Sequence, residues 1–151
     1  MERTEPITLT NMCMVYDGNG NALVEEKIVS DHKGLIFLGG HVENHEPIAD
    51  SMICEIREEI GLKTSDIQLC GIKDRIEENG SRCMVFLYKT NQYSDEFRSS
   101  EEGKVFWMPL EELKKAEPMW HLDKMLEILC GNGYSELFFN KECKNKKSVL
   151  N

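Results

Sequence analysis

The clearest constraint on the fold is an amphipathic helical pattern in residues 47–60. Its apolar residues recur every three or four positions, so at about 100° per residue they form a single stripe. Pro47 suits the first turn of a helix, and Gly61 suits its C-terminal end. The pattern therefore predicts one helix with one buried side. The stripe consists of Ala49, Met52, Ile53, Ile56 and Ile60.

The other side of this helix carries three glutamates, Glu55, Glu58 and Glu59. Like charges three and four residues apart destabilise a helix by about 0.2–0.5 kcal/mol per pair, and no lysine is interspersed to offset them. A solvated helix face is one interpretation. A cluster of carboxylates next to the Gly39-Gly40 pair, where a backbone carbonyl can be approached closely, also provides the oxygen ligands that Mg²⁺ needs. The residues alone leave both interpretations open.

Extended segments and turns surround this helix. Residues 7–17 and 22–29 are joined by DGNGN, which is typical of a hairpin, and Asn79-Gly80 predicts a second hairpin. Antiparallel hairpins interleaved with two main helices favour a mixed α/β sandwich over a doubly wound sheet. We also expect strands at 35–43, 66–76, 82–90 and 104–108, helices at 109–116 and 119–130, loops at 30–34 and 91–103, and a last strand or helix-packing segment at 134–139.

Charge and cysteine content limit the functions of the chain. Its net charge of −9 argues against a basic surface for duplex nucleic acid, although metal ions can mediate contact with a small polyanion. The six cysteines form no C-x-x-C pair, which disfavours a zinc site and favours reduced thiols. No leader or membrane-spanning run is visible. We expect a cytoplasmic protein, a monomer or homodimer, with one domain at 1–140 and a polar, flexible tail at 141–151.

Residues 40–62 resemble the Nudix box, G-x5-E-x7-R-E-U-x-E-E-x-G-U, in which U is aliphatic. Eight of its nine defined positions match. The order of strands and helices also resembles Nudix hydrolases, and LTNMC, GGHVEN, LCGIK and SSEEG are similar to bacterial MutT-type 8-oxo-dGTP diphosphatases. The resemblance implies an α/β (α+β) fold, an α/β/α sandwich around a central mixed β-sheet. The matching residues are Gly40, Glu46, Glu55, Ile56, Glu58, Glu59, Gly61 and Leu62.

The resemblance implies a pyrophosphohydrolase that uses Mg²⁺ or Mn²⁺. Its substrates would be purine nucleoside triphosphates such as 8-oxo-dGTP, hydrolysed to monophosphate and pyrophosphate. Glu58 and Glu59 would be the main metal ligands, Glu55 a ligand or the base that orients water, and the Gly40 carbonyl a further ligand. The box contacts the diphosphate only, so ADP-ribose or a dinucleoside polyphosphate remains an alternative substrate.

Further site residues follow from the same resemblance. Glu102, or Glu101 beside it, would supply one more metal ligand, unless this loop is only solvated. Glu46 would support the start of the helix rather than bind metal. Gly39 would contact the substrate, and His41 could touch phosphate if it is more than an exposed loop histidine. His45 has the same two interpretations.

The recognition of the base is expected near the second main helix. Trp120 could stack on a purine and Asp123 could hydrogen-bond its edge, whereas the alternative for Trp120 is simple coverage of the core. Asn11, a polar residue inside the first strand, is a base reader or a satisfied core amide.

Cys54 departs from the box, because the family has arginine at this position. An arginine would stand four residues before Glu58 and could neutralise and orient a carboxylate through a charge-assisted hydrogen bond. Arg57 lies about 100° away from Glu58 around the helix and therefore does not substitute for an arginine at position 54. The departure raises a further alternative, a catalytically weakened domain that binds a nucleotide.

Overall fold

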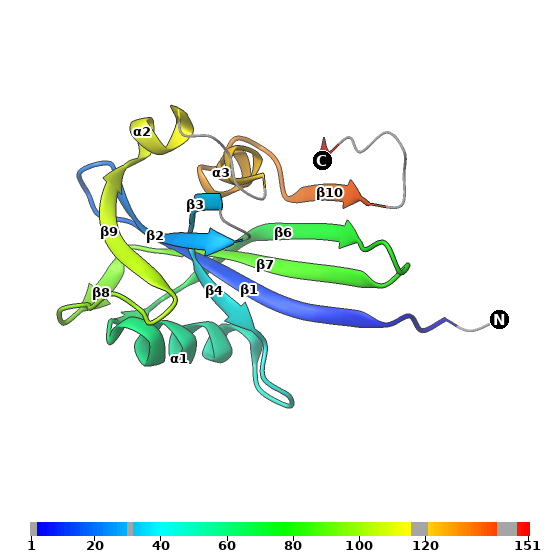
Figure 1. Cartoon of the computed structure of the whole chain (residues 1–151), viewed down its shortest axis with the longest axis horizontal. Helices are drawn as coiled ribbons and strands as arrows, with labels where there is room; N and C mark the ends of the chain where they lie inside the picture. Colours follow the sequence, from blue (N-terminus) through cyan, green and yellow to red (C-terminus); the bar gives the residue numbers. More distant parts are fainter. Residues whose placement is uncertain (1–2, 30–31, 116–120, 142–147) are drawn as a thin grey trace.

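The computed structural model describes residues 3–29, 32–115, 121–141 and 148–151. Three sheets and three helices make up this part of the chain (Figure 1). The central sheet contains, in order, β11 (Val149–Leu150), β10 (Glu136–Asn140), β6 (Gln68–Ile76), β7 (Arg82–Thr90), β1 (Ile7–Val15) and β4 (Leu38–His41). A second sheet contains β3 (His32–Ile36), β2 (Asn21–Val29) and β9 (Gly103–Pro109), and β5 (Lys63–Ser65) pairs with β8 (Gln92–Ser94).

The central sheet is mixed and lies between two layers. β1 pairs in parallel with β7, and β6 in parallel with β10, whereas its other pairs are antiparallel. Helix α1 (Ile48–Ile60) covers one face, and α2 (Leu110–Lys115) and α3 (Leu122–Leu129) lie on the other side (Figure 1). The expected α/β/α sandwich with a central mixed sheet is confirmed.

The alternation of side chains along β1 explains the two layers. Successive residues of a strand point to opposite faces. Met12 and Met14 therefore belong to the core that contains α3, whereas Cys13 and Val15 belong to the core that contains α1. All four side chains are buried, so both faces of this strand are covered.

Helix α1 agrees closely with the amphipathic pattern. Pro47 is its N-cap, and Gly61 ends it with φ of 80°, a left-handed conformation that glycine adopts without the cost of a Cβ. The amide of Gly61 donates to the carbonyl of Arg57 at 2.9 Å. Burying the apolar stripe fixes the rotation of the helix, so Glu55 and Glu59 face the edge strand β4. The fully buried members of the stripe are Met52, Ile56 and Ile60.

The prediction for residues 30–43 is wrong in part. Residues 32–34 belong to β3, where a loop was expected, and the broken strand expected at 35–43 is divided into the end of β3 and β4, which belong to different sheets. Phe37 lies between them and is buried. The glycine pair lets β4 approach β1 closely, because a Cβ at Gly39 would lie 2.3 Å from the carbonyl oxygen of Asn11.

Other differences are smaller. The loop expected at 91–103 contains β8, which has three residues, and its partner β5 was not predicted. Residues 134–139 were expected to form a strand or to pack on the helix, and β10 shows the strand. The tail was expected to be flexible throughout, but Val149 and Leu150 pair with β10.

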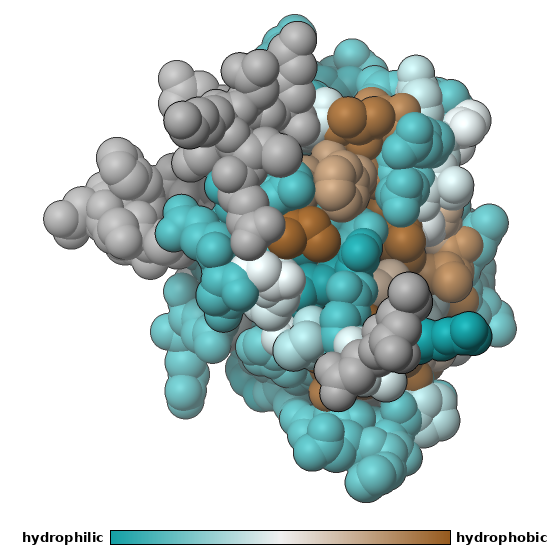
Figure 2. Space-filling model, turned by 90° about the vertical axis from the view of Figure 1, so that its right-hand side faces the viewer, coloured by the Kyte–Doolittle hydropathy of each residue, from teal (hydrophilic) through white to brown (hydrophobic). Residues whose placement is uncertain are grey.

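On the face shown in Figure 2, apolar residues gather in the upper and central part, and hydrophilic residues cover most of the lower part.

Among the helices of the described part, none is long and apolar enough to cross a membrane. The described cysteines Cys13, Cys54, Cys70, Cys83 and Cys130 are all free thiols, as expected.

Candidate active site

A cavity of about 680 Å³ opens beside the edge strand β4. Its floor is the face of the central sheet that carries Thr10 and Val85, and it extends from α1 to the end of β10. Acidic side chains line the end near α1, and basic side chains line the end near β6 and β10. Its volume lies in the range that binds small molecules and cofactors.

The acidic end contains two of the three expected helix glutamates. Glu55 and Glu59 both line the cavity, are partly buried, and are hydrogen-bonded to each other through their side chains. Burial and the adjacent Glu55 raise the pKa of Glu59 to about 8, with smaller effects of Glu25 and Glu102. In the metal-free protein, Glu59 therefore favours its neutral form beside Glu55.

Gly40 makes this arrangement possible. A Cβ at position 40 would lie 2.6 Å from Oε1 of Glu55. Any larger residue would displace that carboxylate from the backbone of β4. The close approach expected from the glycine pair is therefore present, and it brings a helix carboxylate against a strand.

Glu102 also lines the acidic end, as expected. It accepts a hydrogen bond from Lys27 of β2 at 2.9 Å. Burial, the largest single effect, disfavours the charge of Lys27, but the hydrogen bond to Glu102 and the nearby carboxylates of Glu25, Glu102 and Glu59 together outweigh it and raise the pKa of this lysine. Glu101 is exposed in the same turn and does not line the cavity.

A fourth carboxylate was missed by the sequence prediction. Glu25 of β2 is 1% exposed and accepts a hydrogen bond from the Ser100 hydroxyl at 2.7 Å. In the sequence, the signal for Glu25 is its position directly after an apolar run, Ala22, Leu23 and Val24, which the structure buries.

Glu58 and Cys54 lie outside the cavity lining. Glu58 is exposed, and its backbone carbonyl accepts a hydrogen bond from Arg98 at 3.1 Å. Cys54 is also exposed, and slight desolvation together with the carboxylates of Glu46 and Glu58 raises the pKa of its thiol. Arg98 thus lies at the C-terminal end of α1, where the helix dipole favours a cation. It binds a carbonyl group there, not a carboxylate.

The acidic end fits a hard divalent cation. Its donors are all oxygens, which Mg²⁺ prefers, and Oε2 of Glu59 is buried without a hydrogen-bond partner. Among the described residues, no three His, Cys, Asp or Glu side chains already have the geometry of a metal site. The groups that would hold such a cation are the carboxylates of Glu55 and Glu59 and the carbonyl of Gly40.

The basic end was not predicted. Lys73 and Arg75 of β6 and Lys141 after β10 line the cavity there. Alternation in β6 places the first two side chains on one face, which is a signal in the sequence. Lys141 joins them only because β10 pairs in parallel with β6.

The described residues do not bring the expected base-binding side chains together. Trp120 lies outside the described residues. Asp123 is exposed and does not line the main cavity, because the buried side of α3 carries Leu122 and Met125 instead. His121 lines the cavity and contacts Phe139, with ring centroids 4.8 Å apart.

The remaining candidates lie near β4. Asn11 is 2% exposed and lines the cavity, and its amide donates to the Ile48 carbonyl at 3.4 Å. Its Oδ1 is buried without a hydrogen-bond partner, so it is not a fully satisfied core amide. Gly39 and His41 line the cavity. His45 is exposed in the following loop and does not line it.

Comparison with known proteins agrees with this geometry. Residues 7–127 match the NUDIX domain. The chain belongs to the Nudix family. It is 35% identical over 81 residues to YvcI, an uncharacterized Nudix hydrolase of Bacillus subtilis (strain 168). That match covers 50% of this chain and 51% of YvcI, so the chain matches about half the length of this relative.

Solved Nudix structures share the fold. A mutator MutT protein from Bacillus halodurans superposes with a TM-score of 0.78 at 23% identity, covering 95% of this chain and 97% of that one. A MutT NUDIX hydrolase from Burkholderia pseudomallei gives 0.71 at 24% identity, covering 83% and 99%. The NUDIX domain of Shewanella oneidensis NrtR, solved with ADP ribose, gives 0.66 at 10% identity, covering 87% and 90%.

Proposed function

We propose that this Nudix protein is a Mg²⁺-dependent nucleoside-polyphosphate diphosphatase. Its substrates are purine nucleoside triphosphates, including oxidised ones such as 8-oxo-dGTP, and its products are the monophosphate and pyrophosphate. The main support is the pair of carboxylates, Glu55 and Glu59, held against Gly40 at the mouth of a nucleotide-sized cavity. Mutual repulsion of these carboxylates is relieved when a cation binds between them.

The chain supplies orientation and charge for the reaction. Mg²⁺ at this end would polarise the phosphate oxygens and lower the pKa of a bound water. Glu55 and Glu59 hold the cation, and Lys27 offsets the charge of Glu102 beside them. Water attacks a phosphorus, the α,β-bridging oxygen leaves with the other phosphate group, and a carboxylate accepts the proton of the water.

A second candidate is the hydrolysis of another nucleoside diphosphate linked to a group X. The NrtR NUDIX domain, which shares this fold, was solved with ADP ribose. The acidic end would contact the diphosphate of either substrate class in the same way. The rest of the cavity determines which is accepted.

A substrate panel with Mg²⁺ tests both candidates. We expect pyrophosphate and a monophosphate from dGTP or 8-oxo-dGTP, and little turnover of ADP-ribose or a dinucleoside polyphosphate. The Glu59→Gln variant should lose roughly 100-fold or more of the rate, whereas Glu78→Gln, in the exposed turn after β6, should not. Release of inorganic phosphate, or hydrolysis of no nucleotide while Mg²⁺ binds, would contradict the proposal.

A further inference from the structure

The turn that carries Glu102 is attached to β2 through a buried carboxylate. The hydroxyl of Ser100 donates a hydrogen bond of 2.7 Å to Oε1 of Glu25, whereas its other acceptor, the Gly103 carbonyl, is 3.3 Å away. The hydroxyl oxygen accepts bonds from the amides of Glu102 at 3.2 Å and Gly103 at 3.1 Å. A hydroxyl has one donor and two acceptor positions, and these contacts use all of them. Ser100 thus connects Glu25 to the backbone of Glu102.

The end of this turn also packs closely on β2. Gly103 pairs in register with Lys27. A Cβ at Gly103 would lie 2.3 Å from the carbonyl oxygen of Glu26 and 3.1 Å from Cγ of Glu25. Successive residues of a strand alternate between its faces, so Glu25 and Lys27 lie on the same face of β2. Both side chains therefore contact the turn from one side.

These two contacts differ in how firmly they hold the turn. The side chains of Lys27 and Glu102 are 25% and 63% exposed, and an ion pair in contact with water contributes little to stability. Glu25, by contrast, is 1% exposed, and a buried group that loses its hydrogen-bond partner is costly. Glu25 therefore keeps the turn in place even when Glu102 leaves Lys27.

We propose that Glu25 is a positioning residue for the reaction, because through the Ser100 hydroxyl it fixes the turn that presents Glu102 to the acidic end of the cavity. Glu25 itself does not line the cavity, whereas Glu102 does. The inference rests on the proposed function, since it assumes that Glu102 contributes to cation binding or to turnover there.

Hydrogen exchange in the metal-free protein tests the positioning without turnover. The amides of Glu102 and Gly103 would be followed by NMR. We expect Ser100→Ala and Glu25→Leu to exchange them roughly tenfold faster than the wild type, because the turn opens more readily. Glu25→Gln should exchange them at nearly the wild-type rate, because its amide oxygen accepts from the same hydroxyl. Wild-type exchange in Glu25→Leu, or equally fast exchange in Glu25→Gln, would overturn the proposal.

A double variant keeps the test valid if Glu25→Leu alone does not fold. Combined with Ser100→Ala, it leaves neither partner of the buried hydrogen bond unpaired. If Glu25 acts only through Ser100, the double variant should exchange the two amides at the same rate as Ser100→Ala alone. Faster exchange in the double variant would overturn the proposal.

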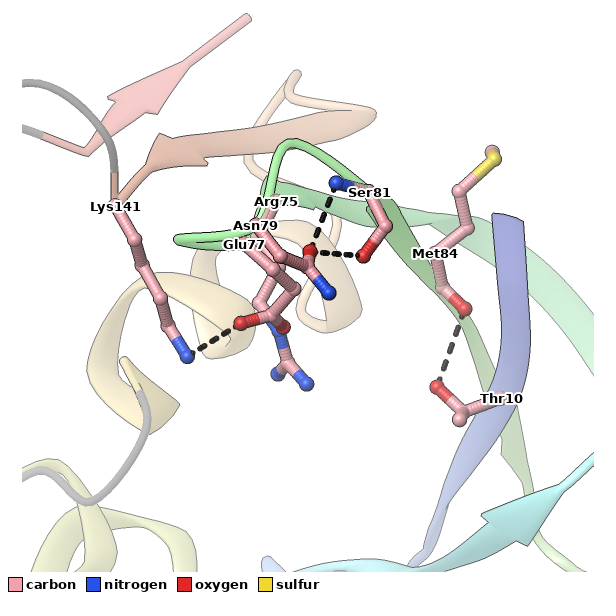
Figure 3. Close-up of polar contacts among 7 residues, drawn as sticks. All are labelled: Thr10, Arg75, Glu77, Asn79, Ser81, Met84 and Lys141. Carbon is pink, nitrogen blue, oxygen red and sulfur yellow. Dashed lines mark hydrogen bonds and ion pairs between the residues drawn. The ribbon is translucent and has the colours of Figure 1, made fainter. Parts of the chain in front are cut away.

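A serine in a different turn provides the matched control. Figure 3 shows Ser81 in the turn between β6 and β7, where its hydroxyl donates to Oδ1 of Asn79 at 2.6 Å. Ser81→Ala removes the same group from a turn, so the amides of Glu102 and Gly103 should exchange as in the wild type. Equally faster exchange of these amides in Ser81→Ala would contradict the assignment to Glu25.

Cation binding shows whether the turn acts on the site. Mn²⁺ would be titrated into the nucleotide-free protein and followed by electron paramagnetic resonance. We expect Glu102→Gln and Ser100→Ala each to weaken Mn²⁺ binding, by up to about tenfold. Together they should weaken it no more than Glu102→Gln alone, because Ser100 acts through Glu102. Additive losses would overturn the proposal.

Hydrolysis then separates this inference from the proposed function. Ser100→Ala should lower kcat with little change in KM, and Glu25→Gln should stay close to the wild type. If Glu102→Gln keeps both the wild-type kcat and the wild-type Mn²⁺ affinity, the positioning role is overturned and the proposed function stands. If the wild type hydrolyses no nucleotide, the proposed function fails, and hydrogen exchange with Mn²⁺ binding still decides the role of Glu25.

Discussion

At the scale of single residues, Glu59 is a carboxylate whose negative charge is disfavoured unless a proton or a cation compensates it. Burial and the adjacent Glu55 disfavour its charge, and one of its oxygens has no hydrogen-bond partner. Residues arranged for function commonly reduce the stability of the unliganded protein. Glu59 is therefore expected to favour Mg²⁺ binding at the expense of metal-free stability.

The Glu59→Gln variant should separate these effects. In chelator the free energy of unfolding of the variant should exceed that of the wild type by roughly 0.5 kcal/mol, because neutral glutamine avoids the cost of burying or protonating a carboxylate next to Glu55. In Mg²⁺ the order should reverse, because a ligand that binds the native state stabilises only the protein that can bind it. Thermal melts with and without Mg²⁺ measure both. A variant that is less stable than the wild type in chelator would contradict this view of Glu59.

Cys54 offers a second test at the same scale. Its side chain is exposed near Glu46 and Glu58, and no arginine replaces the one expected from the Nudix box. Cys54→Arg should raise turnover or Mg²⁺ affinity roughly two- to tenfold by neutralising these carboxylates. The comparison is kcat and the Mg²⁺ concentration for half-maximal rate, with Cys70→Ser as the control thiol. An unchanged or lower rate would show that the chain compensates elsewhere.

At the scale of elements, the contact between β4 and α1 positions the acidic end. The two glycines of β4 act differently. A Cβ at Gly39 would meet the backbone of β1, whereas a Cβ at Gly40 would meet the flexible carboxylate of Glu55. Gly39 therefore allows β4 to pair closely with β1, and Gly40 leaves room for the carboxylate of Glu55.

Alanine at each position should distinguish these roles. Gly39→Ala should destabilise the fold by about 1–3 kcal/mol, because backbone cannot move aside cheaply. Gly40→Ala should keep most of the stability but lose roughly tenfold or more in kcat, because Glu55 is displaced. Urea unfolding and steady-state kinetics on both variants provide the measurement. The reverse pattern, with activity lost only through Gly39, would refute the role given to Gly40.

The sequence predicts the long periodic elements better than the short ones. Helix α1 and the β6–β7 hairpin follow from apolar periodicity and turn residues, which are local signals. The other expected hairpin is wrong in part, because β1 and β2 belong to different sheets and share only the bridge between Tyr16 and Ala22. The division between β3 and β4 depends on one residue, Phe37, and the three-residue strands β5 and β8 carry too few side chains for a pattern. Non-local pairing determines these elements.

The same distinction applies to the site. Glu55, Glu59 and Gly40 lie within a stretch of twenty residues, so their spacing predicts that they converge, whereas Glu58, expected beside them, is exposed outside the cavity. The basic end combines Lys73 with Lys141, which are far apart in sequence and meet only through the parallel pairing of β6 and β10. Asp123 does not line the main cavity, because the buried residues of α3 fix the rotation of that helix and leave Asp123 exposed.

At the scale of the whole molecule, the cavity has opposite charges at its two ends. The α/β/α sandwich places the carboxylates of α1 at one edge of the central sheet and the cations of β6 and β10 several strands away. An electric field of this kind favours one orientation of a ligand whose charge is concentrated at one end. The same arrangement places the cation expected at the acidic end next to one end of that ligand only.

The most direct test of the account is pyrophosphate release as a function of Mg²⁺ concentration, for the wild type and for Glu59→Gln. The account predicts a wild-type rate that rises with Mg²⁺ and saturates, and a variant rate that remains roughly 100-fold lower at every concentration. A variant that reaches the wild-type rate at saturating Mg²⁺ would contradict the metal site at the acidic end of the cavity.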